Sequence, residues 1–74
     1  MRQRIKELLE DALPLVDVES DFLFTELDSL GVTTILMILS SEYDIELDAT
    51  DATPKNLKNL DALVALVKEK QSLK

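Results

Sequence analysis

Apolar residues recur near the start of the chain with the spacing of one helical face. They follow the i, i+3, i+4, i+7, i+8 pattern of an α-helix that packs one side on a core: Ile5, Leu8, Leu9, Ala12 and Leu13. Lys6 and Glu10 lie four residues apart on the polar side, where we expect them to pair. The pattern predicts a helix from Arg2 to Leu13, which Pro14 ends.

A second apolar stretch, Val32 to Leu39, follows Asp28, a residue type favoured as a helix N-cap. Its β-branched residues would also suit a strand. We predict a helix from Ser29 to about Tyr43, because the segment is too long for a typical strand, starts with a cap and does not alternate apolar with polar residues. Four of its residues are expected to face the core: Ile35, Leu36, Leu39 and Tyr43. Three others are expected on the exposed side: Leu30, Thr33 and Met37.

The remaining segments are two connections, a short helix and a last helix. The connection 15–27 holds several large apolar residues, so we expect it to pack down, with Phe22 or Phe24, or both, filling the bundle. Thr53 as N-cap and Pro54 at the first helical position predict a short helix over 54–58, and Asn59 is predicted to cap a helix from about Leu60 to Gln71. The buried stripe of this last part is predicted to be Leu57, Leu60, Leu63, Val64 and Val67.

The composition favours packed helices over other folds. The chain of 74 residues is long enough for one small domain, residues 1–74, and its hydrophobic residues are mostly Leu, Ile, Val and Ala, with a single Gly. These features predict an all-α fold, a small four-helix bundle of three longer helices and one short helix. No Cys or His is present, which excludes disulfides and thiolate metal sites and removes the usual general base of enzymes.

Charge is distributed unevenly along the chain. The net charge is −7, and every basic residue lies at or before Lys6 or at or after Lys55. This layout disfavours nucleic acid as a partner and favours proteins with basic docking surfaces, although acidity alone also keeps small proteins soluble. No signal segment is visible, and the longest unbroken apolar run, Ile35 to Leu39, is too short to span a bilayer. A cytoplasmic monomer without a membrane span is therefore expected.

The acidic loop 44–53 partly matches a calcium-binding pattern. Asp44, Glu46 and Asp48 fall at the first three ligand spacings of an EF-hand loop. Ala49 stands where the sharp turn needs Gly, and Lys55 stands where the bidentate Glu belongs. We therefore predict no dedicated metal site.

The tripeptide Asp28-Ser29-Leu30 carries the candidate chemistry. With Asp28 as N-cap, Ser29 falls in the first helical turn, at the positive end of the helix dipole, where a phosphate is well tolerated. A plain helix cap explains the same three residues. The tripeptide and the order of elements together resemble the acyl carrier protein family over essentially the whole chain. Further similarities are Glu42-Tyr43-Asp44 after the second helix and Thr53-Pro54 with Leu57 before the last.

The resemblance implies that Ser29 carries a covalent 4′-phosphopantetheine arm, with Asp28 as a further cofactor-binding residue. A phosphopantetheinyl transferase would attach the arm, and acyl-loading and acyl-processing enzymes would contact Leu30, Thr33 and Met37. The protein would then be a carrier of acyl thioesters in fatty-acid, lipid or polyketide-type biosynthesis, not an enzyme. Two alternatives stay open: a D-alanyl or aminoacyl carrier, and an unmodified acidic helical adaptor.

Two departures from the family pattern indicate a specialised member. Thr25-Glu26 stands where many members have Leu-Gly, so the approach to Asp28 is expected to differ. Thr34, Ser40 and Ser41 stand where fatty-acid carriers place acidic residues on the second helix. The exposed side of this helix is therefore expected to be neutral.

Overall fold

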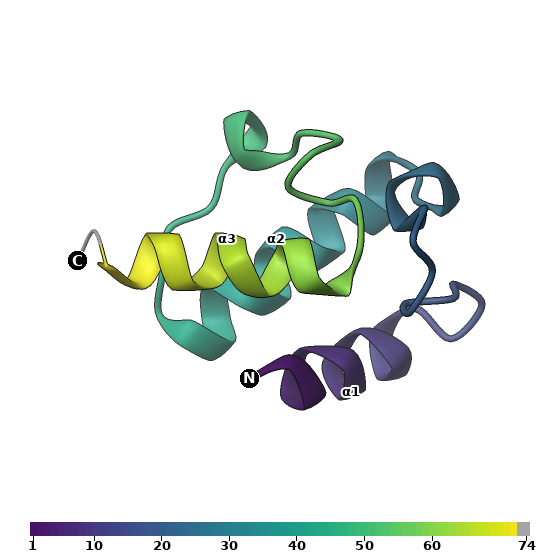
Figure 1. The fold of residues 1–74 in the computed structure, drawn as a ribbon, viewed down its shortest axis with the longest axis horizontal. Helices are drawn as coiled ribbons and strands as arrows, with labels where there is room; N and C mark the ends of the chain where they lie inside the picture. The colour runs from purple at the N-terminus through teal and green to yellow at the C-terminus, as the bar shows by residue number, and fades with distance from the viewer. Residues whose placement is uncertain (73–74) are drawn as a thin grey trace.

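Three α-helices surround one core in the computed structural model, which describes residues 1–72. They are α1 (Arg2–Ala12), α2 (Ser29–Tyr43) and α3 (Leu60–Ser72), and two 3₁₀ turns lie between them, η1 (Leu23–Glu26) and η2 (Ala49–Asp51). Each helix packs against the other two, with α3 crossing in front of α2 and α1 below both (Figure 1). Residues 1–72 contain no strand, so the all-α prediction is confirmed. No helix in this part of the chain is both long and apolar enough to cross a membrane.

The core is built from the faces that the periodicity predicts. Ile5 and Leu9 of α1 meet Ile35 and Leu39 of α2, and all four are fully buried. From the C-terminal part come the buried residues Leu57, Leu60, Leu63, Leu66 and Val67. Leu66 lies outside the predicted stripe, and Leu8, Leu13, Tyr43 and Val64 are only half-buried. The core is thus aliphatic, with no buried polar or charged residue among those described.

The predicted role of the phenylalanines in the first connection is only half right. Leu23 is the fully buried residue, and its N–H donates to the carbonyl of Lys58 at 2.9 Å. Phe24 is half-buried, whereas Phe22 is 69% exposed. Because Leu23 begins η1, the neighbours on either side of it point in other directions. Leucine therefore fills the place expected for an aromatic ring.

The predicted short helix over 54–58 does not form. Its start is as expected, since the Thr53 hydroxyl accepts from the N–H of Asn56 at 3.0 Å, and the N–H of Leu57 donates to the carbonyl of Thr53. One helical turn does not propagate by itself. The carbonyl of Lys58, at the end of this segment, accepts from the N–H of Leu23 in the first connection. The described bundle therefore has three helices and a turn where four helices were predicted.

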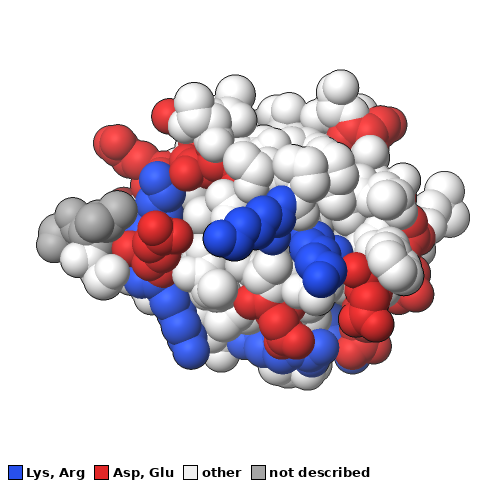
Figure 2. All heavy atoms as spheres, turned by 45° about the horizontal axis from the view of Figure 1, so that its top comes forward, with Lys and Arg blue, Asp and Glu red and all other residues white. Residues whose placement is uncertain are grey.

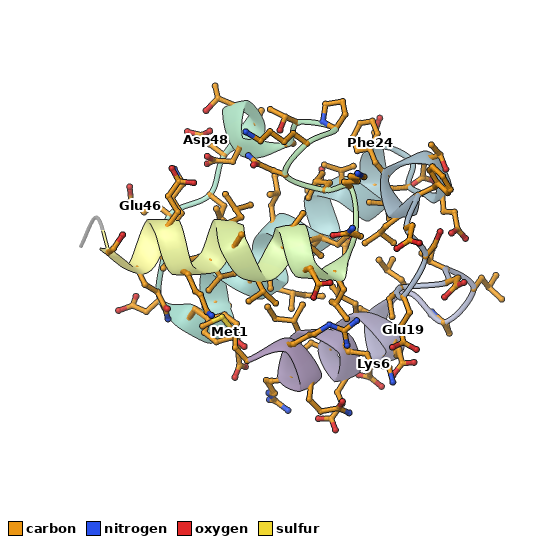
Figure 3. The ribbon with its side chains drawn as sticks, viewed as in Figure 1. Met1, Lys6, Glu19, Phe24, Glu46 and Asp48 are labelled. Atoms are coloured by element: carbon orange, nitrogen blue, oxygen red, sulfur yellow. The ribbon has the colours of Figure 1, made fainter. Side chains whose placement is uncertain are left out.

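Ion pairs connect the first helix to distant segments. Lys6 pairs with Glu19 at 3.6 Å rather than with the predicted Glu10, as their orientation in Figure 3 shows. Arg2 pairs with Asp61 at 2.9 Å. These surface pairs are individually weak, but they hold the long connection and α3 next to α1.

Candidate functional site

The start of α2 is organised by Asp28. This residue has an extended backbone, and its carboxylate accepts from the N–H of Gly31 at 2.7 Å, which caps the helix as predicted. A Cβ at Gly31 would lie 3.3 Å from that carboxylate oxygen and 3.3 Å from a methyl of Leu27. Because Gly31 has no side chain, the Asp28 carboxylate and the Leu27 side chain can both lie close to the backbone of the first helical turn.

Ser29 is the first residue of α2 and is exposed. Its hydroxyl makes no hydrogen bond to any residue in the described range 1–72. The first turn of α2 contains no acidic residue, so the positive end of the dipole is not neutralised from within the helix. A phosphate ester on this oxygen would be accessible and electrostatically favoured.

The chain reaches Asp28 through the 3₁₀ turn η1. Thr25 donates its hydroxyl to the carbonyl of Phe22 at 2.7 Å, and a carboxylate oxygen of Glu26 accepts from the N–H of Asp17 at 3.4 Å. Neither Thr25 nor Glu26 has a positive φ. Side-chain hydrogen bonds, rather than a glycine, shape this approach.

An open groove of about 940 Å³ begins at Ser29 and runs along one side of α2. Its walls come from α2, from Phe24 and Leu27 on the η1 side, and from the η2 side, where Asp48 marks the turn in Figure 3. The η2 side contributes apolar residues: Leu47, Ala49 and Ala52. Among residues 1–72, Asp28 is the one charged residue that lines the groove, so its interior is apolar with a few hydroxyls.

A smaller hollow of about 390 Å³ lies on the other side of the start of α2. Leu13, Leu15 and Val16 from the end of α1 and the following turn line it together with Leu30 of α2. Glu26 and Asp28 also contribute to its lining. The site therefore has an apolar recess on each side of the serine.

The three predicted contact residues are divided between these recesses. Leu30 is 74% exposed and lines the hollow, whereas Thr33 and Met37, the latter 67% exposed, line the groove. All three lie at the surface of α2, as predicted. Sequence reasoning did not place Phe24, Ala49 and Ala52 in the site, because two of them are small loop residues without any periodic signal.

The η2 wall of the groove is fixed by an interlocked set of hydrogen bonds. A carboxylate oxygen of Asp51 accepts from the N–H of Asp48, and the other pairs with Lys70 of α3 at 2.9 Å. Asp48 caps η2 by accepting from the N–H of Thr50 at 2.9 Å. Hydrogen bonds from the Thr50 hydroxyl and amide hold the pKa of Asp48 below its ordinary value, and the hydrogen bond to Asp51 raises the pKa of Lys70.

Asp48 and Asp51 therefore stabilise the fold of this loop. Within residues 1–72, no group of three or more His, Cys, Asp or Glu side chains is arranged to hold a metal ion. The chain also has no histidine, and the carboxylate next to Ser29 in sequence is engaged in the helix cap.

Comparison with known proteins assigns the family. The family described as "Phosphopantetheine attachment site" matches residues 1–67, from α1 through most of α3. The searches of curated proteins and of solved structures found no match. Because the match covers nearly all of the chain, it includes the capped serine, both recesses and the three-helix core. This protein belongs to the phosphopantetheine attachment site family, the acyl carrier protein-type domains to which 4′-phosphopantetheine is covalently attached.

Proposed function

We propose that Ser29 is the attachment residue and that residues 1–74 act as a single carrier domain rather than as an enzyme. The observation that carries this proposal is the exposed Ser29 hydroxyl at the first residue of a helix capped by Asp28. When bound, the arm supplies the thiol that the chain lacks, and the cargo is held on it as a thioester.

The residues around Ser29 fit a phosphodiester at this position. The first turn of α2 holds no acidic residue of its own, so the helix dipole favours the added negative charge, and Asp28 keeps that turn formed. Asp28 has a second carboxylate oxygen that the cap does not use, and this oxygen would help to hold the metal–pyrophosphate group during transfer. Ser29 remains outside the core throughout, so modification requires no unfolding.

The groove beside Ser29 supports an acyl cargo over an aminoacyl cargo. An aminoacyl group carries an ammonium that needs an acidic partner when it leaves water. Apart from Asp28, which caps the helix, the groove offers Val32, Leu36 and Met37 with a few hydroxyls. We place the cargo among the acyl intermediates of fatty-acid, lipid or polyketide-type synthesis in the cytoplasm.

The attachment is tested by intact mass after incubation with coenzyme A, magnesium and a phosphopantetheinyl transferase. The wild-type chain should gain the mass of one arm, and the Ser29→Ala variant should gain none while keeping its helical circular dichroism. Ser41→Ala, an exposed serine on the same helix, is the matched control and should be modified like the wild type. Mass gain by Ser29→Ala would refute the assignment, and an unmodified wild type would favour the acidic adaptor.

A further inference from the structure

We propose that the hollow beside Leu30 is the docking point for the enzyme that modifies Ser29. It receives an apolar side chain of that enzyme, and a neighbouring basic residue of the enzyme meets Glu26. The identity of the partner rests on the proposed function of Ser29, whereas the location and chemistry of the docking point rest on the hollow itself.

Two large apolar side chains at the hollow are largely exposed to solvent. Leu15 is 98% exposed and Leu30 is 74% exposed, although both belong to a chain with an otherwise well-buried aliphatic core. Two large apolar side chains at the rim of one recess mark an interaction site more often than an accidental exposure. A leucine- or phenylalanine-sized group would fit a recess of about 390 Å³.

The rim that presents Leu15 is rigid. The N–H of Val16 donates to the carbonyl of Leu13 at 3.1 Å, which closes a four-residue turn with Pro14 at its second position. Proline at this position fixes φ at a value that such turns require. Leu15 is therefore held at the surface before any partner arrives, so docking loses little conformational entropy.

Charge identifies the kind of partner. Glu26 and Asp28 line the hollow, and no Lys or Arg is among the described residues that line it. A second copy of this chain, with its net charge of −7, would be repelled from the same acidic surroundings. A basic residue beside the inserted apolar group would instead be steered to this side of the molecule.

The position of the hollow leaves the groove free. The hollow lies on one side of the start of α2 and the groove on the other, with Ser29 lining the groove. An enzyme anchored at Leu15 and Leu30 would reach the Ser29 oxygen without covering the recess proposed for the cargo. Docking and cargo would thus use separate surfaces.

The test measures initial rates of arm transfer, as a function of carrier concentration, with a phosphopantetheinyl transferase that modifies the wild-type chain. Leu15→Ser should raise KM by roughly tenfold with kcat retained, because one buried leucine contact is lost. Glu26→Gln should raise KM by about two- to fivefold at low salt, and this difference should disappear in 0.5 M NaCl, whereas that of Leu15→Ser should persist. Leu15→Met should behave like the wild type.

Phe22→Ser is the matched control, because Phe22 is 69% exposed and lines neither recess. Equal melting temperatures of all variants would show that the fold is retained. A wild-type KM for both Leu15→Ser and Glu26→Gln would overturn the docking proposal and leave the role of Ser29 intact. A wild-type chain that gains no arm would instead remove the role of Ser29 and, with it, the partner named here.

Discussion

At the scale of single residues, two neighbours in sequence divide the work at the start of α2. Asp28 uses one carboxylate oxygen to hold the first turn, through the N–H of Gly31. Ser29, one position later, has helical geometry but keeps its side chain in water. The cap fixes where the serine oxygen lies, so the geometry of the proposed modification depends on Asp28 as well as on Ser29.

Substitutions at Asp28 separate capping from any role in transfer. Asp28→Ala should lower the free energy of unfolding by about 1 kcal/mol, because one N–H of the first turn loses its acceptor. Asp28→Asn keeps an acceptor oxygen and should retain most of that stability, yet it should be modified more slowly because the carboxylate charge is gone. Urea unfolding and the initial rate of mass gain measure the two effects. Wild-type rates for Asp28→Asn would assign Asp28 to capping alone.

Residue-level prediction succeeded where a local rule applies and failed where packing decides. Asp28, Thr53 and Asn59 were all recognised as caps from residue type and position, and each accepts the expected N–H. The expectation that Phe22 or Phe24, or both, fill the bundle was only half right. Phe24 packs against the core, but Leu23 is the fully buried residue and Phe22 is exposed, because hydrophobicity alone does not reveal the direction in which the turn η1 points each side chain.

At the scale of elements, helix length decided which predictions held. The bounds predicted for α2 match the structure, although its β-branched residues favour strands, because fifteen residues with a buried face outweigh intrinsic propensity. The segment 54–58 has a good start signal but only one turn, and Leu23 takes the carbonyl of Lys58. No pattern in the sequence reports that long-range hydrogen bond.

An ion pair connects the turn η2, which forms a wall of the groove, to α3. Lys70→Met should increase the hydrogen-exchange rates of the Asp51 and Ala52 amides, since the ion pair between Lys70 and Asp51 fastens this turn to the helix. Arg4→Met removes a comparable surface pair, that with Glu42, far from η2 in sequence, and should leave those rates unchanged. Unchanged exchange in Lys70→Met would show that Asp48 and Asn56 hold the turn without α3.

The same turn should respond to pH only at the extremes. The pKa of Asp48 is lowered in the folded protein. Its contribution to the stability of the turn is therefore present above the ordinary carboxyl pKa of about 3.9, and it is lost as the pH falls through the lower pKa of the folded state. The pKa of Lys70 is raised in the folded protein. Its contribution to the stability of the turn is therefore present below about pH 10.4, and it is lost as the pH rises through the higher pKa of the folded state. Amide exchange at Thr50, corrected for its intrinsic pH dependence, should therefore be flat between about pH 5 and 9. A transition inside that range would mean that another group controls the turn.

At the scale of the whole molecule, charge separates the ends of the chain from its middle. Thirteen of the fifteen acidic residues lie between Glu7 and Asp51, and the three-helix fold brings some of them to basic residues near the two ends. Figure 2 shows one face, on which Lys and Arg atoms lie close to groups of Asp and Glu atoms and next to a broad uncharged area. The pairs of Arg2 and Arg4 are largely exposed, so each contributes little, and the acids without a partner repel one another.

This balance predicts that salt stabilises the fold. Screening weakens the long-range repulsion of a chain with net charge −7 more than it weakens a few short surface pairs, so the melting temperature should rise between about 10 and 300 mM NaCl at pH 7. Two variants with the same change in net charge provide the control. Glu10 is exposed and has no ion partner among residues 1–72, whereas Asp61 is paired with Arg2. Glu10→Gln should raise the melting temperature at low salt more than Asp61→Asn does, because it removes repulsion without removing a pair. A melting temperature that falls with increasing salt would mean that the surface ion pairs outweigh the repulsion. The acidic middle of the chain would then stabilise the fold, instead of destabilising it in favour of partner recognition.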